Sequence, residues 1–483
     1  MDDRVLDRVL DRAAELAKDY LAGVADRPVG PQVDLPALRE ALGGPLPEIG
    51  EDPTAVIERL ARDADPGLIA SAGPRFFGFV IGGSHPAALA ADWLTSAWDQ
   101  NAGLYVIGPA AAVVEEVVGR WLAEVFGLPA GTSCGLTTGA TMASFTALAA
   151  GRHAQLEKAG WDVEEDGLFG APPINVVVGD EAHVTIFASL QMLGLGRSRV
   201  HRVAADEQGR MRADALRETL RRLEGPTVVC AQAGNVNTGA FDPLEEIAAA
   251  VHEHGGWLHV DGAFGLWAAA SPSLRHLVAG VGLADSWTTD AHKWLNVPYD
   301  SGIVFVRDAA AHQGAMRLGA AYYVETEGAE RDNYNWVPES SRRARGFPIY
   351  AALRSLGRQG LADLIDRCSG HARRMARQLV ELDGVAILND VVLNQVLVRF
   401  APDGVDPRLT GPEADTLTRD VIRRVQLDGT CWLGGTTWHG LVAMRISVSG
   451  WNTTPEDIDR SAAAIERCAA DARTALSSEP APA

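Results

Sequence analysis

The sequence predicts an α/β fold with a mainly parallel sheet in a large domain, followed by a smaller α+β C-terminal domain. Short, continuously apolar runs rich in β-branched residues lie between about residues 130 and 310, which is typical of strands buried on both faces. Helical patterns separate several of these runs, as in strand–helix–strand units. With 483 residues, the chain is long enough for one large domain and one or two smaller ones.

An N-terminal helical segment is expected over residues 1–75. Within residues 4–22, apolar side chains recur at helical spacing, at Val5, Leu6, Val9, Leu10, Ala13, Leu16, Ala17 and Leu21. The resulting apolar face must pack either on the rest of the same chain or on a partner subunit. Residues 28–54 are rich in proline and glycine, so we expect an irregular connection there.

The large domain is expected over residues 76–350, with strands at 174–178, 227–230, 257–260 and 302–306. The clearest helix begins with Asp242 as its cap, Pro243 at its first position and Glu245 three residues after the cap. In a sheet of this kind, ligands bind outside the C-terminal ends of the strands.

Residues 351–475 are expected to form the smaller domain, because helical patterns return there with short strands near 385–400 and 441–448. The tail 476–483 is small, polar and proline-containing, so we expect it to be flexible.

Composition excludes several classes of protein. The formal net charge of -20 argues against binding to nucleic acid or to an anionic membrane. Five scattered cysteines without a paired spacing favour reduced thiols over disulfides or a metal site. The chain shows neither a signal-peptide pattern at its start nor 18 uninterrupted apolar residues, so we expect a cytoplasmic protein acting on a small molecule.

Lys293 is the first candidate for chemistry. It follows a strand-like segment and His292, with Trp287, Trp294 and Leu295 as apolar flanks. A lysine that forms an imine must lose its proton, which an apolar setting favours. The alternative is an ordinary surface lysine.

Asp261 ends the predicted strand at 257–260, where carboxylates either face ligands or cap the next helix. If the ligand is pyridoxal 5'-phosphate (PLP), this carboxylate can pair with the ring nitrogen and keep it protonated. Ala263, two residues later, leaves room beside such a ring.

Two further segments complete the set. Residues 136–144 combine glycine and hydroxyl residues at the start of a helix, which suits phosphate but also an ordinary capped helix. His183 directly follows the predicted strand at 174–178, where it can either stack on an aromatic cofactor or satisfy a local hydrogen bond.

The order of these motifs closely resembles that of the group II pyridoxal-dependent amino-acid decarboxylases, the family of aromatic-amino-acid, glutamate and histidine decarboxylases. The resemblance runs from about residue 70 to residue 460 and implies the PLP-dependent transferase fold type I. The matching motifs are Pro74-Arg75-Phe76-Phe77-Gly78-Phe79, Thr138-Gly139-Ala140-Thr141, Ala182-His183, Asn237-Thr238-Gly239-Ala240-Phe241-Asp242, His259-Val260-Asp261, Asp290-Ala291-His292-Lys293-Trp294, Ser341-Arg342-Arg343 and Asn452-Thr453-Thr454.

The resemblance implies a role for each matching residue. Lys293 is expected to hold PLP as a Schiff base, Asp261 to bind the ring nitrogen, His183 to stack on the ring and Ala263 to line its other face. Ala140, Thr141 and His292 are expected to hold the phosphate. Two departures stand out: Asn235 replaces a threonine common near the cofactor, and Gly139-Ala140-Thr141 replaces Gly-Gly-Ser.

In the resembling family, a tyrosine on a flexible loop donates the proton that completes decarboxylation. Tyr334 is the candidate here, although its alignment needs a one-residue gap. Tyr322 and Tyr323 are rivals, and a purely structural role for Tyr334 is the alternative. Because members with phenylalanine at this position act as aldehyde synthases, Tyr334 and His183 together favour simple decarboxylation.

The resulting prediction is PLP-dependent decarboxylation of an L-amino acid to its amine and CO2, in a homodimer whose N-terminal helix wraps the partner. Phe76, Phe77, Phe79, Val80 and Ile81 favour an apolar or aromatic substrate, unless they are core residues; Trp98, Trp432 and Trp438 are possible additions. The alternatives are a PLP-dependent aldehyde synthase, carbon–carbon lyase or aminotransferase, and a catalytically inactive binding protein of the same fold.

Overall fold

The computed structural model describes residues 3–317 and 330–478. The chain forms two compact units. The larger unit comprises Gly82–Arg373 and Asn389–Val396, and the smaller one the described parts of Met1–Ile81, Arg374–Leu388 and Leu397–Ala483. The N-terminal helices and most of the C-terminal elements therefore belong to one compact unit, although the sequence suggests separate segments.

A seven-stranded sheet in the order β1-β7-β6-β5-β4-β2-β3 forms the centre of the larger unit. Its strands are β1 (Ser133–Thr137), β2 (Asn175–Gly179), β3 (His201–Val203), β4 (Thr227–Gln232), β5 (Trp257–Asp261), β6 (Ser286–Asp290) and β7 (Gly302–Val306). Strands β6, β5, β4, β2 and β3 run parallel, whereas β7 is antiparallel to both β6 and β1. The prediction of a mainly parallel α/β sheet is confirmed.

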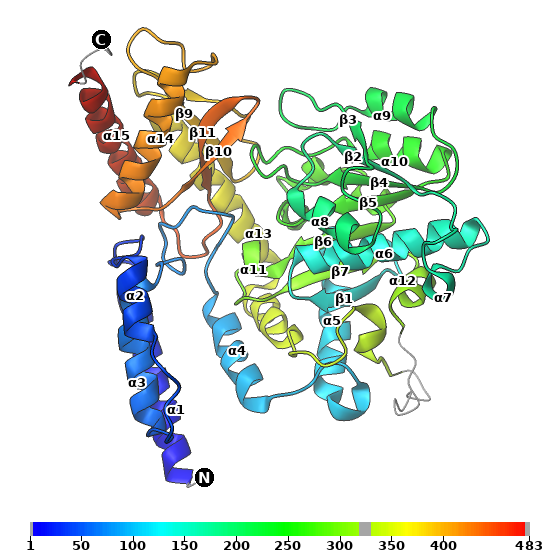
Figure 1. Cartoon of the computed structure of the whole chain (residues 1–483), viewed down its shortest axis with the longest axis horizontal. Helices are drawn as coiled ribbons and strands as arrows, with labels where there is room; N and C mark the ends of the chain where they lie inside the picture. Colours follow the sequence, from blue (N-terminus) through cyan, green and yellow to red (C-terminus); the bar gives the residue numbers. More distant parts are fainter. Residues whose placement is uncertain (1–2, 318–329, 479–483) are drawn as a thin grey trace. The chain divides into compact units, whose positions relative to one another are not determined.

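The larger unit also contains helices, several of which pack against this sheet (Figure 1). They are α4 (Pro86–Trp98), α5 (Pro109–Phe126), α6 (Ala140–Lys158), α7 (Val163–Asp166), α8 (Val184–Met192), α9 (Ala213–Leu220), α10 (Leu244–Glu253), α11 (Ala291–Trp294), α12 (Ala309–Met316) and the first part of α13 (Gly346–Leu379), with 3-10 turns η2 (Tyr105–Ile107), η3 (Gly265–Ala270), η4 (Arg275–Val278), η5 (Val281–Leu283) and η6 (Asn333–Trp336). Helix α6 lies along the sheet, where its Ala147 and Leu148 share a core with Val178 and Val304. Burial of both faces explains why strands such as β2 and β7 are almost continuously apolar.

The start of α10 corrects one detail of the sequence prediction. The helix begins at Leu244, and Pro243 at its cap makes no side-chain capping bond. The Asp242 carboxylate instead accepts the backbone N–H groups of Met211 and Gln232, each at 2.7 Å. Burial raises the pKa of Asp242 to about 7. The Asp242 side chain, which the local pattern predicts as a helix cap, thus forms tertiary hydrogen bonds instead.

The smaller unit contains a second, four-stranded sheet in the order β10-β11-β9-β8. Its elements are α1 (Asp3–Gly23), α2 (Leu35–Leu42), α3 (Pro53–Ala64), η1 (Asp65–Gly67), β8 (Val385–Ile387), β9 (Gln395–Phe400), α14 (Pro412–Asp428), β10 (Gly434–Trp438), β11 (Leu441–Ser447) and α15 (Pro455–Ser478). Helix α2 lies within the segment expected to be irregular, where Asp34 caps it by accepting the N–H of Ala37. Across the described ranges, no helix combines the length and apolarity needed to cross a membrane.

The register of the large sheet aligns the ends of several strands at one edge. Gln232, the last residue of β4, pairs with Asp261, the last residue of β5, and Asp261 pairs with Thr288 near the end of β6. Because these strands are parallel, their carboxyl ends meet at the same edge. The side chains that follow them are therefore brought together.

Candidate active site

Lys293 lies in the short helix α11, one turn after the end of β6. Its Nζ atom is 3.0 Å from Oδ2 of Asp290, and its side chain is 21% exposed. The chain has only three lysines, and the other two, Lys18 and Lys158, are exposed on helices α1 and α6. Lys293 is thus the lysine that the fold places at the carboxyl edge of the sheet.

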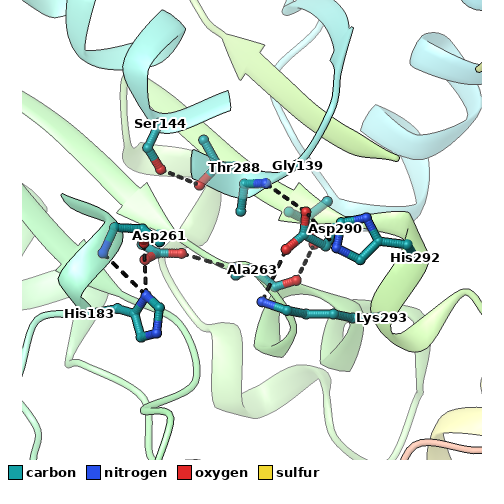
Figure 2. Close-up of polar contacts among 12 residues, drawn as sticks. Gly139, Ser144, His183, Asp261, Ala263, Thr288, Asp290, His292 and Lys293 are labelled. Carbon is teal, nitrogen blue, oxygen red and sulfur yellow. Dashed lines mark hydrogen bonds and ion pairs between the residues drawn. The ribbon is translucent and has the colours of Figure 1, made fainter. Parts of the chain in front are cut away.

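Asp290 connects Lys293 to the start of helix α6 (Figure 2). Its Oδ1 atom accepts the backbone N–H of Ala140 at 2.6 Å, and its side chain is only 4% exposed. Ala140 is the first residue of α6, and the N–H groups of a first helical turn lack acceptors within the helix. An acidic oxygen already occupies this position, so the start of α6 accepts an anion.

The start of α6 also depends on a close backbone contact. A Cβ atom at Gly302, the first residue of β7, would collide with the backbone of Gly139. Glycine at position 302 therefore lets β7 lie against the turn that precedes Ala140 and Thr141. The backbone carbonyl of Thr141 is in turn held by the hydroxyl of Ser189, at 3.1 Å.

His292 adds a second polar group beside Asp290. Its Nδ1 accepts the backbone N–H of Ser301 at 3.0 Å, so in the neutral ring the proton is on Nε2. That Nε2 lies 3.5 Å from Oδ1 of Asp290. Burial lowers the pKa of His292, although the nearby Asp290 carboxylate partly offsets this effect. A neutral ring with Nε2–H directed to this point can donate to a phosphate oxygen.

Asp261 lies at the end of β5 and is 5% exposed. Its Oδ1 accepts the backbone N–H of Ala263 at 3.1 Å, while the carbonyl of Ala263 accepts the N–H of Asp290 at 2.9 Å. Ala263 thus joins the two strand-end carboxylates, and Figure 2 shows it between them.

His183 faces the same region as Asp261, because both line one small cavity together with Gln232. His183 is the residue before helix α8, and its Nδ1 accepts the N–H of Thr185 at 3.4 Å. The Thr185 hydroxyl lies 2.8 Å from the same nitrogen. These contacts fix the imidazole ring, so the local hydrogen-bonding role and a stacking role are compatible.

Asn235 is 1% exposed, and protein groups engage both ends of its amide. Its Oδ1 accepts the N–H groups of Asn237 and Thr238 at 2.8 and 3.2 Å, and its Nδ2 donates to Oε2 of Glu181 at 2.9 Å. A Cβ atom at Gly209, which has a φ of +81°, would collide with these side chains. Asn235 therefore fixes the loop that carries His183.

Tyr334 differs from the prediction. It was expected on a flexible loop, yet it lies in η6 with its side chain fully buried, and its backbone N–H donates to Gly103 at 3.0 Å. A side chain without exposed surface cannot reach a substrate from a loop, which favours the structural role. The rivals Tyr322 and Tyr323 lie outside the described residues.

Sequence reasoning missed the role of Asp290 and Glu181. Asp290 belongs to the motif around Lys293 and ends a strand as Asp261 does, so its position could have identified it as a site residue. No sequence pattern marks Glu181 as a site residue, because its partner Asn235 is 54 residues away.

These residues fit PLP. The start of α6 accepts an anion, and the buried carboxylate of Asp261 lies at the end of β5. Lys293 and the small residue Ala263 lie between these two points. The fold agrees: the structure of TDC from Oryza sativa, solved with PLP and tryptamine, superposes with a TM-score of 0.90 over 98% of both chains, at 23% identity. The protein is a PLP-dependent enzyme of the α/β fold type I.

Residues 37–401 match the family model described as the pyridoxal-dependent decarboxylase conserved domain. The chain belongs to this family and is a PLP-dependent carboxy-lyase.

Named relatives differ in what they act on. The chain is 27% identical over 460 residues to an aromatic-L-amino-acid decarboxylase of Bacillus atrophaeus, covering 92% of each. It is 30% identical over 439 residues to an L-2,4-diaminobutyrate decarboxylase of Rhizobium meliloti, covering 89% of this chain and 85% of the relative.

Proposed function

We propose that this enzyme removes CO2 from an aromatic or large apolar L-amino acid and releases the corresponding amine. The observation that carries the proposal is the arrangement of Lys293, Asp261 and the α6 start at one sheet edge. The aromatic preference is supported by the relatives that are named for aromatic amino acids.

In this proposal each residue has one task. Lys293 would hold PLP through its side-chain amine. Asp261 would accept a hydrogen bond from the N–H of the ring nitrogen and keep it protonated, while His183 and Ala263 would lie against the two faces of the ring. His292 and the N–H groups of Ala140 and Thr141 bind the phosphate, and Asn235 positions the His183 loop. When bound, PLP supplies the electron sink that loss of CO2 requires.

The segment 76–81 separates into core residues and an exposed one. Phe76, Phe77 and Val80 are buried, whereas Phe79 is 61% exposed and stacks on Trp432 with ring centroids 5.7 Å apart. Phe79 and Val80 both have positive φ angles, 53° and 63°, which non-glycine residues rarely adopt. Phe76, Phe77 and Val80 are therefore core residues, and of this segment Phe79 alone presents an aromatic ring to the surface.

Product analysis over the twenty amino acids tests this function. We expect CO2 and amine in equal amounts with aromatic and large apolar L-amino acids. A preference for L-2,4-diaminobutyrate would contradict the aromatic assignment.

Oxidative aldehyde formation is the second candidate function. The sequence argument against it depended on Tyr334 together with His183, and the burial of Tyr334 removes this residue as a donor on a flexible loop. The same assay separates the two reactions, because an aldehyde synthase consumes O2 and releases H2O2 and ammonia instead of the amine. A decarboxylase leaves O2 unchanged.

The working form is proposed to be a homodimer. None of the described side chains of α1, α2 and α3 is buried, and Leu6 and Leu10 on α1 are 43% and 57% exposed. Exposed apolar side chains along these helices indicate a surface that a partner covers. A second copy of this chain is the simplest partner, because it supplies the same surface again.

The double variant Leu6→Gln/Leu10→Gln tests this proposal by analytical ultracentrifugation. We expect at least a tenfold weaker dimer, since both substitutions replace apolar groups at the expected interface. Asp7→Asn/Asp11→Asn on the same helix is the control, because both carboxylates are exposed. A dimer of unchanged strength would contradict the role of α1, and a monomeric wild-type protein the homodimer itself.

A further inference from the structure

Asp290 holds two groups that the proposed site needs free. Its Oδ1 accepts the N–H of Ala140 at 2.6 Å, and its Oδ2 is paired with the ammonium group of Lys293 at 3.0 Å. The carboxylate is almost fully buried, so water does not screen these contacts effectively. One side chain therefore connects the phosphate end of the site to its reactive lysine.

Both contacts oppose cofactor binding. The start of the 19-residue helix α6 attracts anions, but a carboxylate already occupies its first N–H group. A phosphate placed there meets a second negative charge. The contact with Oδ2 of Asp290 also holds the Lys293 nitrogen away from reaction, because the nitrogen must leave this partner before it can bond to an aldehyde carbon.

We propose that Asp290 is a latch that couples phosphate binding at the α6 N-terminus to release of Lys293. The inference rests on the proposed PLP site. Phosphate displaces the carboxylate from the N–H of Ala140, and the same movement separates Oδ2 from Nζ. As the two groups separate, the Lys293 ammonium leaves one proton on Oδ2 of Asp290, and its amine forms a C–N bond with the aldehyde carbon. Loss of the aldehyde oxygen as water completes the Schiff base, without an oxidant or reductant.

The latch can be tested with pyridoxal, which has the aldehyde but lacks the phosphate. Schiff-base formation on Lys293 is followed by visible absorption and located by borohydride reduction and peptide mass spectrometry. In the wild-type protein, we expect inorganic phosphate to accelerate the reaction with pyridoxal at least tenfold. In Asp290→Asn, whose amide can still accept the N–H of Ala140, the reaction should be fast without phosphate and change less than twofold on its addition.

Asp214→Asn, which removes an exposed carboxylate on α9, should behave like the wild type. If Asp290→Asn fails to fold, Asp290→Ser retains a hydrogen-bond acceptor without the charge and should give the same result. Equal phosphate acceleration in wild type and variant would overturn the latch while leaving the PLP site intact. Failure of both proteins to react with PLP itself at Lys293 would overturn the latch and the proposed site roles together.

Discussion

Replacing Lys293 with alanine is expected to lower turnover by about a thousandfold or more, the scale seen when a covalent group is removed from an active site. Lys293 is the only lysine at the carboxyl edge of the sheet, because Lys18 and Lys158 are exposed on helices. The alanine variant should also lose the visible absorption of the protein–PLP Schiff base. Decarboxylation of an aromatic L-amino acid, followed as CO2 release, measures the loss.

Two further variants separate chemistry from folding. Lys293→Arg keeps a positive charge beside Asp290 but cannot form the Schiff base. This variant should therefore fold normally and have no activity. Lys158→Ala removes an exposed lysine near the end of α6 and should leave turnover unchanged. Turnover of Lys293→Ala at more than a tenth of the wild-type rate would contradict the role of Lys293.

Asp261→Asn is expected to lower turnover by about a hundredfold to a thousandfold, the usual cost of losing one preorganised electrostatic partner. The substitution is isosteric, and the asparagine Oδ1 can still accept the N–H of Ala263. It removes the negative charge that keeps the ring nitrogen protonated. PLP should therefore still attach to Lys293, which absorption spectra can show, while CO2 release becomes slow.

Asp261→Asn should thus separate cofactor attachment from catalysis, a split that a general loss of structure would not give. Asp214→Asn is the control for charge removal in the same unit. If Asp261→Asn turned over normally with PLP bound, the ring nitrogen would need no carboxylate partner, and our assignment of Asp261 would be wrong.

The strands and the residues that end them were predictable because local patterns specify them. The predicted strand at 302–306 is β7, and those at 227–230 and 257–260 fall within β4 and β5. A parallel sheet then gathers whatever follows these strands at one edge. Asp261 and Lys293 were singled out as candidates in this way.

The residues that sequence reasoning missed or misplaced depend on contacts distant in the chain. Ala140 and Asp290 are 150 residues apart, and no local sequence pattern predicts their hydrogen bond. Asp242 has the sequence of a helix cap, but the N–H groups of Met211 and Gln232 bind its carboxylate. Tyr334 illustrates the same limit, because its burial depends on packing rather than on the alignment of its loop.

The most direct test of the central claim is to identify the lysine that PLP modifies. The holoenzyme is reduced with borohydride, digested and mapped by mass spectrometry, with only three lysines to distinguish. We expect the reduced pyridoxyl group on Lys293, at close to one per chain, with Lys18 and Lys158 unmodified. A label on either of those lysines, with Lys293 unmodified in an active preparation, would contradict the proposed site.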